Sequence, residues 1–325
     1  MAAFLDALLF LGSLAVTLAV AAFFARRLDR VGLRLGLPET LLGLLTALAA
    51  DAPETSSAIA ALVKGKNDVG VGVILGSNVF NLAAMVGLSA IICGGVRIRR
   101  EALAIEGAVG VAATVIVGAL VLELLGPWPT LGVLACVLIP YLTLLGLGPE
   151  RSPRRLRRFF GEPHRPDHVL AHGERLLVPS LLLLPALAII VAGSTGMVEA
   201  ALNLAHRWSV PDVIVGIVVL AILTSLPNAF TAVRLALQQR GSALVSETLN
   251  SNTTNLFFGI SIPALFIGLG STSALSGFDL AWLLLMNVVV LALLAPRDGV
   301  RRSGGAAILA LYAVFVAVQI IAEST

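Results

Sequence analysis

Ten long apolar segments fill most of this 325-residue chain and limit what it can fold into. Each is close to the ~20 residues that a helix needs to cross the hydrocarbon core of a bilayer. Outer-membrane β-barrels are excluded, because their strands alternate polar and apolar positions over about ten residues. The sequence therefore predicts an all-α membrane protein of ten transmembrane helices. The expected spans are 4–25, 37–63, 69–93, 103–122, 129–147, 176–203, 211–239, 243–268, 278–295 and 305–322.

The first apolar segment differs from a cleaved signal peptide. It lies in "MAAFLDALLFLGSLAVTLAVAAFFARR", which has no positive start, contains Asp6 and has an apolar run longer than the usual ~7–15 residues. We therefore expect an uncleaved first span. Cys93 and Cys136 lie in separate apolar segments, which favours neither a disulfide nor a metal site.

Basic residues predict the orientation of the spans. If the N-terminus lies outside, the inner connections hold 19 of the 22 Lys and Arg residues, and the outer ones keep only Lys64, Lys66 and Arg207. The positive-inside rule is then satisfied at every inner connection, so both termini are expected outside a bacterial inner (plasma) membrane. The basic excess indicates topology and contact with anionic membrane lipids, and no binding of nucleic acid.

An internal repeat relates two distant parts of the chain. Residues 53–81, "PETSSAIAALVKGKNDVGVGVILGSNVFN", align without gaps with residues 227–255, "PNAFTAVRLALQQRGSALVSETLNSNTTN", at an offset of 174. Five spans separate the copies, and an odd number inverts the second relative to the first. Inverted repeats are typical of secondary transporters, whose ion sites lie near the midplane between the halves.

The repeat also predicts the domain organisation. We expect a first half over 1–147 and a second half over 176–325, each of five spans, joined by a basic cytoplasmic linker over 148–175. The repeated segments themselves cover about 38–92 and 211–266.

Polar residues inside the repeat predict a cation site. Pro53 and Pro227 each remove a backbone donor and are expected to break spans two and seven. Asp51 and Glu54 lie one helical turn apart at the first break, and carboxylates within a span are costly and usually functional. Hard cations prefer oxygen ligands. The candidate ligands are Asp51, Glu54, Ser77, Asn81, Thr224, Ser225, Asn228, Ser251 and Asn255, with Asn78, Glu247 and Asn252 as further candidates.

Simpler interpretations of these residues stay open. Asp51 could cap a helix at the broken turn, and the asparagines could join helices by hydrogen bonds. Glu247, one turn before Ser251, could be a third acid, a proton relay or a residue of a cytoplasmic funnel. Glu106, Glu123 and Glu199 lie towards the ends of their spans, where we expect interfacial positions.

At these motifs the sequence resembles the sodium/calcium exchanger superfamily of cation antiporters, in its bacterial ten-helix form. The family carries "G-T-S-x-P-E" and "G-S-N-x-x-N/D" in each repeat; here they read "AADAPE" and "GSNVFN", then "LTSLPN" and "NSNTTN". The resemblance implies alternating access, with spans one and six moving. It implies ion ligands at Glu54, Asn81, Asn228 and Asn255, supported by the Ala50 carbonyl, Asp51, Ser77, Thr224, Ser225 and Ser251.

Departures from the family pattern bear on the transported ion. Calcium-exchanging members usually carry an acid in each repeat, whereas Asn228 and Asn255 are neutral here. Asp51 stands where a serine is expected and restores one charge. The net ligand charge of about −2 balances one divalent or two monovalent ions, and close, desolvated acids also favour proton coupling.

We therefore expect a secondary-active antiporter that moves Ca²⁺ or another cation against Na⁺ or H⁺. A Na⁺/H⁺ or other monovalent cation/proton antiporter of the same fold, a cation channel and a non-transporting membrane scaffold are the alternatives. No enzyme motif is found, and no cofactor is expected besides the transported cations. His164, His168 and His172 recur in the basic linker, where a solvated segment is favoured over a regulatory metal site.

Overall fold

The computed structural model describes residues 2–35, 44, 47–153, 156–160, 181–270, 272 and 275–322. Eight helical segments in this part of the chain are long and apolar enough to cross a membrane. They are α1 (Ala2–Arg34), α4 (Asn67–Asn81) continued by η1 (Leu82–Leu88) and α5 (Ser89–Cys93), α6 (Arg100–Val121), α7 (Pro127–Arg151), α10 (Leu183–Trp208), α11 (Asp212–Ile214) continued by η2 (Val215–Leu220) and α12 (Ala221–Leu237), α15 (Leu275–Leu294) and α16 (Arg302–Ala322).

The two remaining expected spans carry most of the polar repeat residues. One comprises helical residues 47–50 and α3 (Ala52–Val63), and residues 36–43 and 45–46 before it lie outside the described residues. The other is a continuous helical segment of α13 (Gly241–Thr254), η3 (Asn255–Ser261) and α14 (Ile262–Ile267). The predicted all-α membrane fold is confirmed.

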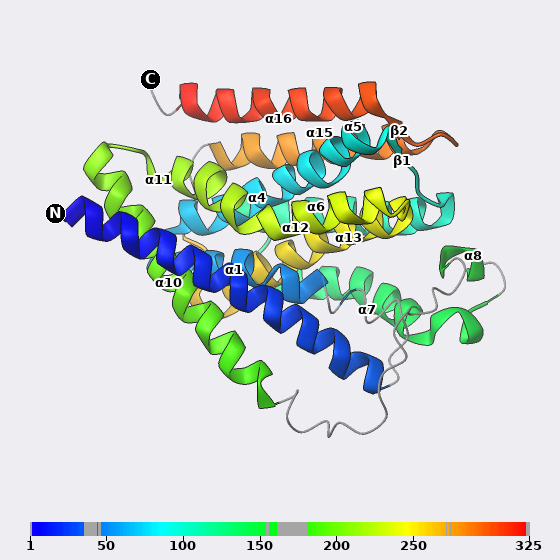
Figure 1. Ribbon diagram of the computed structural model, residues 1–325, viewed down its shortest axis with the longest axis horizontal. Helices are drawn as coiled ribbons and strands as arrows, with labels where there is room; N and C mark the ends of the chain where they lie inside the picture. The colour runs from blue at the N-terminus through cyan, green and yellow to red at the C-terminus, as the bar shows by residue number, and fades with distance from the viewer. Residues whose placement is uncertain are drawn as a thin grey trace.

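Helix α4 lies at the centre of the bundle (Figure 1), and its Val73, Ile74 and Leu75 have no exposed surface. Glycine allows another backbone to approach it closely. A Cβ atom built on Gly76 would lie 2.2 Å from the carbonyl oxygen of Ile217 in η2. The glycines of "GVGVILG" therefore serve helix packing.

Helices α1 and α10 lie side by side at the edge of the bundle and cross the other helices obliquely (Figure 1). Small residues line their contact, because a Cβ atom on Gly193 would lie 2.3 Å from the Thr17 hydroxyl oxygen. The outer surface of α1 is strongly apolar; Phe4 and Leu8, for example, are exposed. The pair thus packs tightly internally and presents α1 largely to lipid.

The irregular turns of the two repeats correspond to each other. Helix α4 continues into the π-helical η1, and α13, shifted by 174 residues, continues into the π-helical η3. π-Helical turns inside α-helices are frequent at functional sites. The repeat predicted from sequence is therefore visible in the backbone geometry.

Of the two predicted helix breaks, an interruption is found near Pro53 and none is found at Pro227. Asp51 lies in a turn between helical residues 47–50 and α3, with Pro53 in the first turn of α3. The predicted break at Pro227 is wrong, because α12 runs from Ala221 to Leu237 with Pro227 inside it. One missing donor removes one backbone hydrogen bond, and the remaining bonds of α12 maintain the helix.

The two ends of the bundle differ in charge. At one end, which we call the arginine end, β1 (Gly95–Val96) pairs antiparallel with β2 (Val300–Arg301), and β2 contacts α16. The arginines in these strands, next to them or at the starts of α6, α13 and α16 are Arg97, Arg99, Arg100, Arg240, Arg301 and Arg302. The predicted linker over 148–175 starts here within α7, includes the short α8 (Arg157–Phe160) and otherwise extends beyond the described residues, as do His164, His168 and His172.

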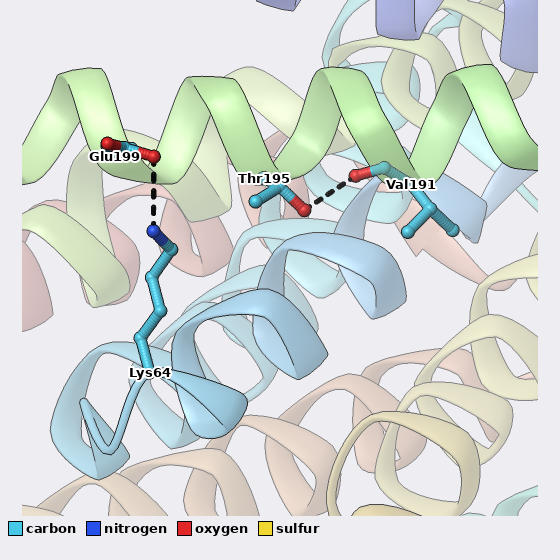
Figure 2. Close-up of polar contacts among 4 residues, drawn as sticks. All are labelled: Lys64, Val191, Thr195 and Glu199. Carbon is cyan, nitrogen blue, oxygen red and sulfur yellow. Dashed lines mark hydrogen bonds and ion pairs between the residues drawn. The ribbon is translucent and has the colours of Figure 1, made fainter.

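At the opposite end, which we call the lysine end, three ion pairs connect separate helices. Lys64, which caps α3, contacts Glu199 of α10 at 3.2 Å (Figure 2). Lys66 and Asp212 are 2.9 Å apart, as are Arg207 and Asp6. All three basic residues assigned to the outer connections are therefore ion-paired.

Candidate functional site

Asp51 and Glu54 lie at the contact between the two repeats, and neither has any exposed surface. Asp51 precedes the first turn of α3, and Glu54 lies within that turn. The turn brings both carboxylates towards α12, α13 and η3 of the second repeat. The local irregularity is small, because Asp51 keeps helical φ/ψ, its N–H donates to the Ala47 carbonyl at 2.9 Å, and its carbonyl accepts from the Thr55 N–H at 3.0 Å.

Three donors from the second repeat surround Asp51. Its Oδ1 accepts hydrogen bonds from Asn228 Nδ2 and Ser251 Oγ, both at 2.7 Å. Its Oδ2 accepts one from Thr254 Oγ1 at 3.0 Å. Thr254 was absent from the predicted set, although it lies one turn after Ser251 on the same helix.

Glu54 is bound by the same elements. Its Oε1 accepts hydrogen bonds from the Ser225 hydroxyl and, at 3.2 Å, from Asn228 Nδ2. Its Oε2 accepts one from Asn255 Nδ2 at 2.7 Å. Asn228 therefore bridges both acids, and every donor to either carboxylate belongs to the second repeat.

Asparagines of the two repeats meet in reciprocal pairs. Asn78 Nδ2 donates a hydrogen bond to the Asn252 backbone carbonyl at 3.0 Å. In turn, Asn252 Nδ2 donates one to the Asn78 backbone carbonyl at 3.0 Å. Asn81 donates to Asn252 Oδ1 at 3.3 Å, and Asn255 donates to Asn78 Oδ1 at 3.2 Å. Asn78 corresponds to Asn252, and Asn81 to Asn255, so these contacts obey the symmetry of the inverted repeat.

The amide oxygens of this cluster are available to a ligand. The Oδ1 atoms of Asn81, Asn228 and Asn255 are buried without a hydrogen-bond partner among the described residues. Buried polar atoms are usually paired, so three such oxygens in one cluster call for an explanation. Each amide carries donors on one side and an acceptor on the other, and rotation of the group exchanges them.

Two predicted residues are close but have other contacts. Thr224 Oγ1 donates to the Leu220 carbonyl of its own helix at 2.8 Å, and Ser77 Oγ donates to the Ala221 carbonyl at 3.4 Å. Both side chains are buried. Glu247 lies one turn before Ser251, half-buried, and its charge is close enough to be repelled by that of Asp51.

The site has no internal counter-charge. Among the described residues, neither Asp51 nor Glu54 forms an ion pair with Lys or Arg. The same part of the chain has no group of three or more His, Cys, Asp or Glu side chains that could hold a metal ion. Removing an ion from water costs several kcal/mol even after relaxation. Two buried acids, neutral amide oxygens and hydroxyls therefore fit a hard cation or protons.

Of the three acids expected at the membrane interface, Glu123 and Glu199 are exposed. The expectation for Glu106 is wrong, because only 5% of its surface is accessible. It lies in the second turn of α6, on the face that packs against α13.

Comparison with known sequences identifies relatives. The pattern of the sodium/calcium exchanger protein family matches residues 5–159 and 179–321. The chain is 27% identical over 131 residues to the sodium/calcium exchanger MaX1 of Methanosarcina acetivorans, covering 40% of this chain and 37% of that protein. It is 33% identical over 127 residues to the sodium/potassium/calcium exchanger 4 of Mus musculus, covering 36% of this chain and 20% of that protein. The matched region thus spans less than half the length of either relative.

The fold is similar to that of a solved structure. The sodium-calcium exchanger NCX_Mj, soaked with 2.5 mM Na⁺ and 10 mM Sr²⁺, superposes with a TM-score of 0.64 at 19% identity. The match covers 97% of this chain and 99% of that chain. Since the family pattern matches both halves of the sequence and the same fold is found, this integral membrane protein belongs to the sodium/calcium exchanger protein family, whose members are transporters and not enzymes.

Proposed function

We propose that this protein is a secondary-active antiporter that moves Ca²⁺, or another cation, against Na⁺ or H⁺. The observation that carries the proposal is the fully buried pair of acids, Asp51 and Glu54, without a basic partner in the described part of the chain. Amides of the second repeat surround them. The relatives named for sodium and calcium exchange support the same class of cargo.

In this proposal the ligands come from both repeats. Asp51 and Glu54 supply the negative charge, and the unpartnered oxygens of Asn81, Asn228 and Asn255 supply neutral ligands. The remaining proposed contributors are the hydroxyls of Ser77, Thr224, Ser225 and Ser251, together with Asn78, Asn252 and Glu247 as further candidates.

The asparagines can act as a switch between the empty and the loaded site. In the structure, Asn228 and Asn255 direct their N–H groups towards the carboxylates. A bound cation competes for the same carboxylate oxygens. Rotation of the amides then directs their oxygens at the cation and removes the N–H groups from it. The same side chains thus stabilise both states.

Charge balance explains why transport is an exchange. Two unneutralised acids in a closed site cost several kcal/mol. Each 1.4 kcal/mol reduces the population of such a state about tenfold. An occluded site therefore forms only with one divalent cation, two monovalent cations or an equivalent number of protons. The protein then cannot return empty, which couples the two fluxes.

Alternating access requires a part of the protein that moves relative to the site. We assign this role to α1 and α10, which pack against each other and lie at the edge of the bundle (Figure 1). By the positive-inside rule, the arginine end faces the cytoplasm and the lysine end faces outward, in a bacterial inner (plasma) membrane.

A Na⁺/H⁺ antiporter is the second candidate, favoured by one observation. Asn228 and Asn255 occupy positions at which acids would raise the site charge, so only two carboxylates remain. Each carboxylate can hold one proton or balance one Na⁺. A charge of −2 does not by itself select a divalent ion.

Ion uptake into proteoliposomes tests the proposal. We expect ⁴⁵Ca²⁺ uptake that requires an opposing Na⁺ or H⁺ gradient, with the two gradients imposed separately. Glu54→Gln should abolish uptake, whereas the exposed Glu123→Gln should retain it. Gradient-dependent Na⁺ uptake without Ca²⁺ uptake would select the second candidate. Flux that ignores the counter-ion would identify a channel, and the absence of any flux would contradict transport.

A further inference from the structure

A second buried acid lies outside the site described above. Glu106 of α6 is 5% exposed, and its Oε2 atom has no hydrogen-bond partner among the described residues. The Ser246 side chain of α13 lies close enough to act on the Glu106 carboxyl group. A carboxyl group inside a membrane span is costly and usually functional.

Polar residues of three helices meet around Glu106. Tyr141 of α7 is buried, lies within electrostatic range of Glu106 and donates its hydroxyl hydrogen to Asn250 Oδ1 of α13 at 2.5 Å. The Tyr141 oxygen keeps its lone pairs for a further donor or a cation. We call the group of Glu106, Tyr141, Ser246 and Asn250 the α6–α7–α13 cluster.

The α6–α7–α13 cluster and the Asp51 site lie on different faces of α13. Ser246 and Asn250 are four residues apart and share one helical face, which also carries Thr253, 3.7 Å from a Cβ built on Gly110 of α6. Ser251 and Thr254 project from a neighbouring face and bind Asp51. Glu106 therefore belongs to a separate cluster and is no ligand of the first site.

The charge of Glu106 has no direct partner. Arg99 is the charged side chain that acts on it, but the two form no ion pair, and the Arg99 guanidinium donates to the Phe159 carbonyl at 3.0 and 3.3 Å. Tyr141 is the titratable group that faces it from α7. A single buried carboxylate is neutralised by one positive charge, and a divalent ion would leave a net charge of +1 in the same apolar surroundings.

We propose that the α6–α7–α13 cluster is a second cation-binding site, which takes one singly charged cation, either a proton or an alkali ion. Glu106 supplies the charge, and Tyr141 Oη and Ser246 Oγ supply neutral oxygens. Helix α13 contributes residues to both sites. A cation bound at the α6–α7–α13 cluster therefore acts on the helix that presents Ser251 and Thr254 to Asp51. The binding itself is independent of whether the protein transports calcium.

Infrared difference spectroscopy of the purified full-length protein tests cation binding at the α6–α7–α13 cluster without a transport assay. The background variant combines Asp51→Asn, Glu54→Gln and Glu247→Gln, so that the acids assigned to the first site contribute no carboxyl band. In choline buffer at neutral pH, we expect the carbonyl-stretch band of one buried protonated carboxylic acid. Glu106→Gln should remove this band, and Glu123→Gln, an exposed acid, should leave it unchanged.

Replacing choline by Na⁺ distinguishes the two ligands. Loss of the band at constant pH assigns an alkali-ion site, and persistence of the band assigns a proton site; both support the proposal. Tyr141→Phe keeps the acid and removes one hydroxyl, so it should shift the band even if Glu106→Gln does not fold. A spectrum in choline without any Glu106-dependent band would contradict the proposed second site. A band that Tyr141→Phe leaves unshifted would contradict it as well.

Discussion

Replacing Asn78 or Asn252 by leucine tests the symmetry of the repeat energetically. Each side chain donates one hydrogen bond to the partner's backbone carbonyl at 3.0 Å, and each Oδ1 accepts one from a second asparagine. Each substitution therefore removes two interhelical bonds, and no bond is shared between the two side chains. Leucine has the same branched skeleton of side-chain heavy atoms, so the main change is the loss of these bonds.

The expected magnitude follows from interhelical hydrogen bonds in membranes, which average about 0.6 kcal/mol and reach about 1.7 kcal/mol. Two bonds give a loss of about 1 kcal/mol for each variant, and no more than about 3.5 kcal/mol. Because Asn78 and Asn252 contact each other within one hydrogen-bond network, the loss in the double variant should differ from the sum of the two single losses by about 0.5–3 kcal/mol.

Reversible unfolding in SDS mixed micelles, followed by circular dichroism, measures these free energies of unfolding. Asn287→Leu is the matched control, since Asn287 is buried and donates only to the Leu283 carbonyl of its own helix. It should lose less than either of the other variants. A loss confined to one of Asn78→Leu and Asn252→Leu, or losses in both no larger than that of Asn287→Leu, would refute the reciprocal arrangement.

Three further predictions follow from the packing, the lysine end and the site. Gly76→Val should destabilise the protein by about 1–3 kcal/mol or more in the same unfolding assay, because its side chain would collide with the Ile217 carbonyl; unchanged stability would contradict the close approach of α4 and η2. The Lys64–Glu199 pair is partly exposed, so a double-mutant cycle should give less than about 1 kcal/mol, and less still at high salt; a larger coupling would contradict a screened surface pair. Asn228→Asp adds a third acid beside the other two, and should tighten Ca²⁺ binding relative to Na⁺ by about tenfold or more, measured as displacement of ⁴⁵Ca²⁺ by Na⁺; an unchanged ratio would contradict the charge argument.

Much of the architecture could be predicted from the sequence, because a membrane restricts the options. Spans must be long and apolar, and a gap-free repeat five spans apart must be inverted. The offset of 174 residues also predicts which asparagines face each other, and Asn78 and Asn252 do meet. The grouping of Asp51 and Glu54 with Asn228 and Asn255 follows from the same symmetry. Their role as cation ligands stays a prediction.

The internal repeat did not predict the contact between Thr254 and Asp51. Thr254 corresponds to Phe80 in the first repeat, so comparison of the repeats gave no reason to select it. Its helical phase was informative, since it lies three residues after Ser251. Asp51 Oδ2 accepts the hydrogen bond from Thr254, and Phe80 in the first repeat has no side-chain donor for an equivalent contact.

The environments of Pro227 and Glu106 depend on the neighbouring helices and could not be predicted. A proline lowers helix stability without ending the helix, and α12 continues through it. Glu106 lies close to the start of its span, where an isolated acid is typical of the interface. Whether it faces lipid headgroups or a neighbouring helix depends on the rotation of α6, which one acid in an apolar run does not reveal.

Equilibrium binding of ⁴⁵Ca²⁺ and ²²Na⁺ to the purified protein tests the central claim most directly. The wild-type protein should bind at least one of the two ions saturably, Glu54→Gln should lose that binding, and Glu123→Gln should retain it. Saturable binding that is unchanged in Glu54→Gln would contradict a cation site at the two buried acids.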